Sequence, residues 1–160
     1  MKRLAPVLLS LSVLSLGGPV VGSASASSTT AKESAIRRCV NVERGKRGIA
    51  PLRRSVALDQ AARLHARQMR TRRFFDHVDL AGRSPADRVS LFTDAFGEGV
   101  GENIAGGNAT AKATCRQWMN SPGHRRNFLD PDYAYLGAGY AAGGRYRHYW
   151  VQTFALDPQD

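Results

Sequence analysis

The feature that most constrains the fold is a pair of cysteines far apart in the sequence. Cys39 and Cys115 are the two cysteines of the 160-residue chain. In an exported protein such a pair is most simply one disulfide, which closes a long loop and contributes roughly 2 to 5 kcal/mol to stability. Two buried free thiols are the alternative, and a catalytic cysteine is not expected. If the disulfide forms, the fold must bring these two segments into contact.

The N-terminus indicates export, the setting in which a disulfide persists. Lys2 and Arg3 precede an apolar run over residues 4–16, and residues 24–26 form a small-residue cleavage site. This pattern predicts a signal peptide over residues 1–26. The apolar run is shorter than the roughly 20 residues that span a bilayer, so a retained anchor is the less favoured alternative. We therefore expect a secreted, extracellular protein with no transmembrane segment after signal removal.

The remainder is long enough for one compact domain with a core of its own. Residues 27–32 are small and polar and predict a short flexible leader. The domain then occupies residues 33–160, and we expect it to be a monomer.

The chain is strongly basic, with a formal net charge of +10. It has no zinc-finger spacing, no RNA-binding signature and no basic region followed by heptads, so nucleic acid is a poor partner for a secreted protein. Anionic envelope polymers or lipid headgroups fit the charge better, and a surface that merely keeps the protein soluble is the simpler alternative.

Apolar spacing predicts helices at residues 33–46, 56–71, from 84 to about 95 and from about 110 to 120. The second is the clearest, with one apolar stripe that consists of Leu58, Ala62, His65 and Met69. His65 thus faces the core, where a hydrogen-bonded structural role is favoured over a ligand role. The opposite stripe, predicted to be solvated, consists of Arg63, Arg67 and Arg70.

Helix and turn signals define the second half of the chain. Ser84 followed by Pro85 is a good helix start, and Pro122 should stop the helix that carries Cys115. The segments 135–140 and 146–154 are aromatic and β-branched, and the glycine-rich linker between them predicts a hairpin. Helices and extended segments therefore alternate.

Two further segments contain candidate site residues. The glycine-rich stretch at 97–107 is not a phosphate loop, because it lacks the Gly-Lys-Ser/Thr ending. Its glycines would let the backbone approach a neighbour, and Glu102 within it needs a partner such as an imidazolium or a metal. His77 follows two aromatic residues in the sequence FFDH.

Seven motifs in order resemble the bacterial branch of the SCP/CAP family, named for cysteine-rich secretory proteins, antigen 5 and plant pathogenesis-related proteins. They are NVERGKRGIAPL, ARLHARQM, FFDHVDLAGRSPADR, GENIAGG, WMNSPGHRRNFLD, LGAGY and YWVQTF. The resemblance covers nearly the whole chain after the predicted signal peptide. It implies an α/β fold, a three-layer α-β-α sandwich with a surface cleft, and it supplies no single agreed reaction.

In eukaryotic members of this family the cleft displays two histidines and two glutamates. His77 matches the first histidine, and Glu102 matches the glutamate of the Gly-Glu-Asn motif that continues with Asn103. The other two positions depart from the pattern. Ser121 stands where the family has a second glutamate, and Tyr149 stands where it has a second histidine.

His124 is the natural third member of the cleft, because the Ser-Pro-Gly break before it would turn its ring inward. A structural hydrogen bond at a helix end is the alternative role. His148 lies one position from the family's histidine, and strand alternation would send it to the other face unless a bulge intervenes. The predicted cleft residues are His77, Glu102, Asn103 and His124.

Three functions fit these residues. The favoured one is a non-catalytic extracellular module that binds a small molecule, lipid or envelope component in the cleft. A metal-dependent hydrolase is the second, because His77, Glu102 and His124 could hold zinc or another divalent cation and leave a position for water. Against it, the chain has neither a HExxH helix nor a nucleophile elbow around Ser121. The third is an electrostatic binder of anionic cell-wall polymer, which needs only the arginines.

Overall fold

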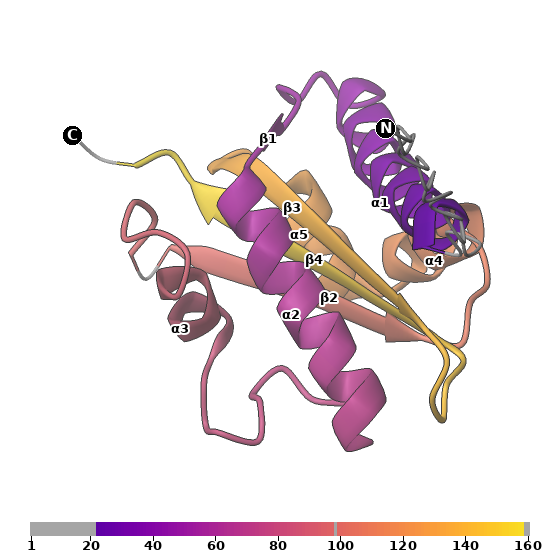
Figure 1. The fold of residues 1–160 in the computed structure, drawn as a ribbon. Helices are drawn as coiled ribbons and strands as arrows, with labels where there is room; N and C mark the ends of the chain where they lie inside the picture. The colour runs from indigo at the N-terminus through magenta and orange to yellow at the C-terminus, as the bar shows by residue number, and fades with distance from the viewer. Residues whose placement is uncertain (1–21, 98, 159–160) are drawn as a thin grey trace, which may run out of the picture.

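The structure is a computed structural model that describes residues 22–97 and 99–158 (Figure 1). The signal peptide predicted for residues 1–26 lies largely outside these residues. The elements along the chain are α1 (Gly22–Gly45), β1 (Arg53–Arg54), α2 (Val56–Arg72), α3 (Pro85–Ser90), β2 (Val100–Gly106), α4 (Ala111–Asn120), α5 (Pro122–Leu129), β3 (Tyr133–Ala142) and β4 (His148–Leu156).

The strands form one four-stranded sheet in the order β1-β3-β4-β2. β3 and β4 pair antiparallel, which confirms the predicted hairpin. β2 pairs antiparallel with β4, and the short β1 runs parallel to β3. The prediction assigned no strand to residues 97–107, where β2 lies, because glycine has low strand propensity. β2 is thus an edge strand, which leaves one of its sides open to the residues of both helical layers.

Helices cover both faces of this sheet, with α2 on one face and α1, α4 and α5 on the other (Figure 1). Strand alternation sends Ile104 and Val151 toward α2. The other face of β4 places Trp150 and Phe154 in a core with residues of α1, α4 and α5. The predicted three-layer α-β-α sandwich is therefore confirmed.

α2 confirms the clearest predicted helix, and its predicted apolar stripe is buried. Ser55 caps its start by accepting a hydrogen bond from the Leu58 amide. Two glycines of β3, Gly137 and Gly139, let the helix lie directly on the sheet, because a Cβ at either position would overlap the α2 backbone. The LGAGY motif is thus a packing requirement.

α1 starts earlier than the predicted helix at 33–46. Residues 27–32, predicted to be a flexible leader, are helical. No proline or glycine interrupts the chain between Gly22 and Gly45, so a helix can continue through the polar segment. Lys32 also holds this part of α1 to the domain, since its Nζ donates to the Ala109 carbonyl at 2.7 Å. Within the described residues, no helix combines the length and apolarity needed to cross a bilayer.

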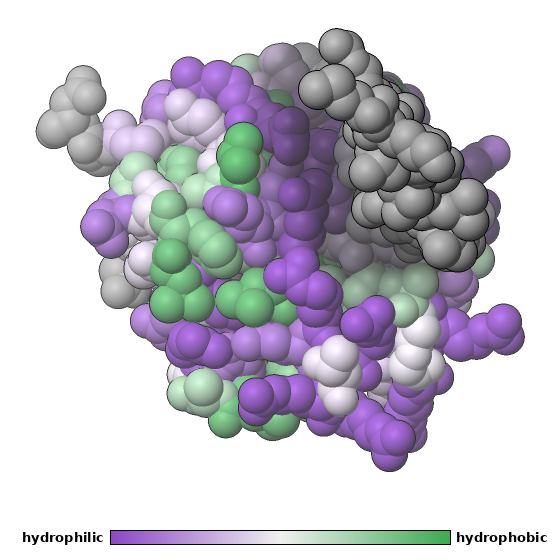
Figure 2. All heavy atoms as spheres, viewed as in Figure 1, coloured by the Kyte–Doolittle hydropathy of each residue, from purple (hydrophilic) through white to green (hydrophobic). Residues whose placement is uncertain are grey.

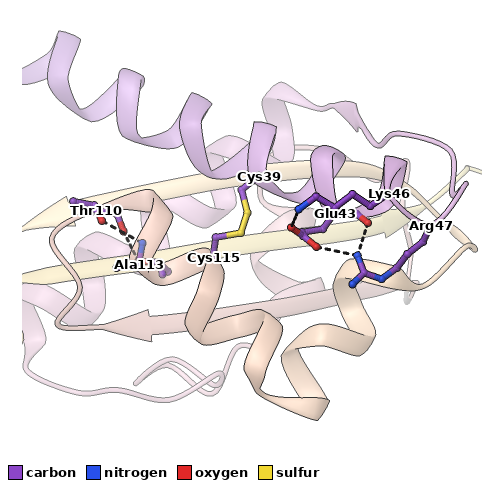
Figure 3. Close-up of a disulfide and its surroundings, with 8 residues drawn as sticks. Cys39, Glu43, Lys46, Arg47, Thr110, Ala113 and Cys115 are labelled. Carbon is purple, nitrogen blue, oxygen red and sulfur yellow. Dashed lines mark hydrogen bonds and ion pairs between the residues drawn. A yellow bond between two sulfur atoms is a disulfide. The ribbon is translucent and has the colours of Figure 1, made fainter.

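A disulfide joins Cys39 of α1 to Cys115 of α4 (Figure 3). The two Cα atoms are 6.4 Å apart, and the bond bridges two helices as predicted. One turn further along α1, Glu43 pairs with Lys46 and Arg47 on the same surface (Figure 3). The disulfide therefore fixes the packing of α1 against α4 on one side of the sandwich.

The remaining helices differ from prediction at their ends. α4 confirms the helix predicted from about 110, and Thr110 caps it. The helix predicted from 84 to about 95 ends at Ser90. Pro122 stops α4 as predicted but also begins α5, because proline lacks only an N–H that the first turn of a helix does not use.

The arginine stripe of α2 is only partly solvated. Arg67 is exposed, as predicted. Arg63 instead donates from Nε to the buried carboxylate of Glu33 at 2.9 Å, and this hydrogen bond raises the pKa of Arg63. The prediction was wrong for Arg63 because its partner lies on α1, which no pattern within α2 reveals.

Candidate functional site

A cleft of about 450 Å³ lies along the open edge of β2. Both helical layers contribute to it, because an edge strand has no neighbouring strand on that side. The lining residues are Phe75, Asp76 and His77 of the α2–α3 loop, Ile104, Ala105 and Gly106 of β2, Gln117 of α4, His124 of α5 and Tyr146 of the β3–β4 loop. The structure thus brings the predicted His77 and His124 to one cleft.

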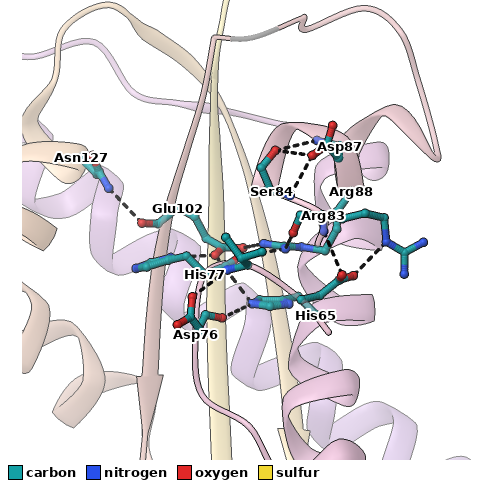
Figure 4. Close-up of polar contacts among 11 residues, drawn as sticks. His65, Asp76, His77, Arg83, Ser84, Asp87, Arg88, Glu102 and Asn127 are labelled. Atoms are coloured by element: carbon teal, nitrogen blue, oxygen red, sulfur yellow. Dashed lines mark hydrogen bonds and ion pairs between the residues drawn. The ribbon is translucent and has the colours of Figure 1, made fainter. Parts of the chain in front are cut away.

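Glu102 is the buried carboxylate behind this cleft (Figure 4). Its Oε1 lies 2.9 Å from His77 Nδ1, and its Oε2 accepts a hydrogen bond from Arg88 Nη2 at 2.7 Å. His65 Nε2 is 3.8 Å from Oε1. The carboxylate needed a positive partner, and a buried arginine provides it together with the predicted imidazole.

Arg88 was missed by sequence reasoning. Its side chain is 1% exposed, and its Nη1 donates to the carbonyls of His77 and Arg83, each at 2.8 Å. The α3 capping box between Ser84 and Asp87 fixes the helix turn that carries it (Figure 4). A lone arginine in a short helix gives no periodic signal. The signal that was present is indirect: a buried Glu102 requires a cation.

His77 combines a bond to Glu102 with access to solvent. Its side chain is 49% exposed. The hydrogen bond with Glu102 raises the pKa of His77, against the smaller opposing effect of burial. The shift favours the protonated ring, which donates from Nδ1 to the carboxylate, and Nε2 is the ring nitrogen not engaged by Glu102.

His65 lies beneath the cleft and is fully buried. Burial lowers the pKa of His65, which favours the neutral ring. Its Nε2 lies 2.8 Å from the Asp76 carbonyl, so Nε2 carries the proton and donates it. This confirms the predicted orientation toward the core, and the hydrogen bond holds the loop that presents His77.

His124 approaches the cleft from α5. Its Nδ1 lies 2.8 Å from Ser121 Oγ, the residue that replaces the family's second glutamate. Burial lowers the pKa of His124, and the charge of His77 lowers it further. The cleft therefore contains two histidines of opposite tendency: His77 favours the charged ring and His124 the neutral ring.

Asn103 and His148 point away from the cleft. Asn103 follows Glu102 on the strand, so its side chain lies on the other face, where Nδ2 donates to the His124 carbonyl at 3.1 Å. It supports α5 and does not line the cleft. His148 Nδ1 lies 2.6 Å from the Tyr140 hydroxyl, on the face that strand alternation predicts.

The three predicted metal ligands do not form a metal-ligand cluster. Over residues 22–97 and 99–158, no group of three His, Cys, Asp or Glu side chains is placed to hold a metal ion. Both oxygens of Glu102 are instead engaged, one by His77 and one by Arg88. A metal bound by Glu102 at this position would therefore compete with His77 and Arg88 for the carboxylate.

A sandwich of this topology, with a histidine and a buried Gly-Glu-Asn glutamate at the edge strand, defines a CAP domain. The sequence profile of the cysteine-rich secretory protein family matches residues 37–154, and the chain belongs to this family.

One sequence relative and two solved structures illustrate the similarity. The uncharacterized protein YkwD of Bacillus subtilis is 36% identical over 128 residues, which is 80% of this chain and 48% of YkwD. An extracellular protein containing a SCP domain from Bacillus anthracis has a TM-score of 0.76 at 24% identity, over 88% of this chain and 45% of that one. An outer surface protein from Borrelia burgdorferi has a TM-score of 0.73 at 20% identity, over 79% of this chain and 93% of that one. The chain thus spans about half of YkwD, and the two solved structures share its fold.

Proposed function

We propose that this chain is a secreted bacterial CAP-domain module that binds a small organic ligand in the cleft without catalysing a reaction. The observation that carries the proposal is a half-exposed His77, held by Glu102, in a cleft with two aromatic side chains in its wall. Phe75 and Tyr146, whose ring centroids are 5.2 Å apart, line the same cleft. A cleft with apolar walls and few polar groups is typical of small-molecule sites.

The ligand class follows from these side chains. The raised pKa of His77 favours a positively charged ring with one nitrogen not engaged by Glu102, while the lowered pKa of His124 favours a neutral ring. The aromatic side chains favour a partly apolar molecule. An anionic lipid or envelope fragment small enough for about 450 Å³ satisfies all of these requirements.

The similar fold of an extracellular protein from Bacillus anthracis supports secretion, together with the disulfide. The metal-dependent hydrolase is the weaker alternative, because Arg88 already neutralises Glu102. Ser121 Oγ lies 2.8 Å from His124 Nδ1 and positions that ring. A Ser-His hydrolase is less favoured, because Ser121 has no nucleophile-elbow context.

Imidazole NMR tests the proposal, because the chain has four histidines that include a control. Soluble muropeptides and monomeric lysophosphatidylglycerol are titrated into the ¹⁵N-labelled protein. We expect the imidazole signals of His77 and His124 to shift on saturation, while the signal of His148 stays unchanged.

His77→Ala should weaken the affinity for whichever of the two probes binds by about tenfold, the order expected for a lost charged hydrogen bond. If the probes shift only backbone signals of exposed arginines and no histidine signal, the result would instead favour the alternative of an electrostatic binder of anionic cell-wall polymer.

A further inference from the structure

A second groove lies on the opposite side of the molecule, between α1 and the β1 edge of the sheet. Its volume is about 520 Å³. The lining residues are Ser34, Arg37, Arg38, Asn41 and Val42 of α1, Leu52 and Arg54 at β1, and Leu136 of β3. Figure 2 shows hydrophilic side chains gathered on this face between α1 and the start of α2. The groove shares no residue with the cleft that contains His77.

One buried carboxylate holds two of the three arginines. Asp59 is fully buried, and its Oδ1 accepts a hydrogen bond from Arg37 Nη1 at 2.8 Å. Its Oδ2 accepts from Arg54 Nε at 2.6 Å. The amide of Ala138 also donates to Oδ1, at 2.8 Å. These bonds orient both guanidinium groups and leave Asp59 with little further capacity to accept hydrogen bonds.

The groove has more positive than negative charge. Three guanidinium groups against one carboxylate leave a surplus of two positive charges. The other acidic side chain nearby, Glu33, is engaged by Arg63. Among the described residues, Arg38 has no ion-pair partner, and neither do the two terminal nitrogens of Arg54.

The groove has a fixed wall that holds one arginine in orientation. Arg37 is 13% exposed, and its two terminal nitrogens donate to Asp59 and to Ser34 Oγ. Asn41 holds the wall in place, since its side chain bonds to both the amide and the carbonyl of Leu52. Asp59 also fixes Arg54 through Nε while 51% of that side chain stays exposed, so its terminal N–H groups are preoriented for an oxyanion.

We infer that this groove binds a phosphate ester of a small polyol. The free N–H groups of Arg38 and Arg54 match the non-bridging oxygens of a phosphate, for which guanidinium groups have a fork geometry. A phosphate monoester carries about −1.5 to −2 charges at neutral pH, which matches the surplus. Val42, which is 55% exposed, gives the groove an apolar side beside Leu52 and Leu136 for the carbon skeleton of the ester.

Calorimetric titration of glycerol 3-phosphate into the full chain tests the inference, with glycerol as the neutral control ligand. We expect saturable binding of the phosphate ester and none of glycerol. Arg38→Gln should weaken binding by about tenfold, since a charged hydrogen bond is lost. Arg38 has no ion-pair partner among residues 22–97 and 99–158, so this variant should retain the melting temperature of the parent. Arg54→Gln should weaken binding similarly while Arg37 and Ala138 still hold Asp59.

Arg67→Gln is the matched control, because Arg67 is exposed on α2 and the variant loses the same single charge. Binding should stay within about twofold of the parent. Vesicles of phosphatidylglycerol, compared with phosphatidylcholine, distinguish the two sources of a phosphate ester. Vesicle binding that depends on Arg38 and Arg54 assigns the groove to a lipid headgroup, while binding of glycerol 3-phosphate alone assigns it to a soluble ester.

Two results would overturn the inference. The first is an equal loss of binding in Arg67→Gln and Arg38→Gln, which would show diffuse attraction to net charge. The second is the absence of Arg38-dependent binding to both glycerol 3-phosphate and vesicles. Either result leaves the cleft at His77 untouched, since that site is tested with different probes.

Discussion

Replacing Arg88 with methionine should destabilise the protein more than any other single loss of charge near the cleft. The substitution keeps a similar side-chain volume and removes the cation that faces Glu102. Both partners are buried, at 1% and 2% side-chain exposure. The variant therefore leaves Glu102 without its buried positive partner, although His77 still contacts its other oxygen.

The expected cost follows from the contacts that disappear. Breaking a buried ion pair by removing one partner costs about 3 to 5 kcal/mol. Arg88 Nη1 also satisfies the carbonyls of His77 and Arg83, which lie in the loop beside the cleft. We therefore expect a loss of about 4 kcal/mol in the free energy of unfolding, a large part of the ~5 to 15 kcal/mol typical of a domain.

Urea unfolding followed by circular dichroism measures this loss, and Arg83→Gln is the control. Arg83 pairs with Asp79 in the same segment, and its side chain is 36% exposed. Asp79 is 2% exposed but keeps hydrogen bonds from the Ala81 and Arg83 amides when the guanidinium is lost, so the cost should be smaller, about 1 to 2 kcal/mol. The double variant Arg88→Met, Glu102→Gln should recover part of the stability, because the buried charge is gone. Equal stability of Arg88→Met and Arg83→Gln would refute the assignment of Arg88 as the partner that makes a buried Glu102 tolerable.

Three further predictions concern the disulfide, the pH dependence and the metal alternative. Thiol titration of the natively secreted protein in denaturant without reductant should find no free thiol, and reduction should lower the free energy of unfolding by roughly 2 to 5 kcal/mol; two reactive thiols would contradict the bond. The folded-state pKa of His77 is raised above 6.5, so the stability from its bond to Glu102 is fully present below pH 6.5 and disappears as the pH rises through the folded-state value. Urea unfolding between pH 6 and 9 should show this decline in the parent and a flatter profile in His77→Gln; identical profiles would refute the linkage. Calorimetric titration of zinc tests the metal-dependent hydrolase alternative. That alternative requires His124→Ala to weaken zinc binding well over ~10-fold and His148→Ala to leave zinc binding unchanged. Equal zinc binding by both variants would eliminate it.

Local patterns determined much of the fold. The apolar spacing of residues 56–71 identified α2 and the burial of His65, because the helical period places these side chains on one face. Ser84 followed by Pro85 marked the start of α3, and the glycine-rich linker after Tyr140 marked the hairpin. Strand alternation also placed His148 away from the cleft. Each of these features depends on residues close together in the chain.

Motif order, which reports family membership, predicted the α-β-α sandwich and singled out His77 and Glu102. Local sequence patterns failed to predict an element where its residues have a low intrinsic propensity for that element or show no amphipathic spacing. Glycine-rich β2 gave no strand pattern, and the polar segment before residue 33 gave no amphipathic helix. Both elements form because of neighbours that lie elsewhere: β4 pairs with β2, and the Ala109 carbonyl binds Lys32.

Only the tertiary structure decided which charged groups meet. Arg88 reaches Glu102, Arg63 reaches Glu33, and Arg37 shares Asp59 with Arg54. In all four pairs the partners come from different elements, and the pairing depends on how those elements pack. The periodic spacing of apolar residues predicts which face of an element is buried. The position of one charged residue in the sequence does not predict its ion-pair partner. The physical reason is that burial makes an ion pair necessary, while the packing of distant segments selects the residues that form it.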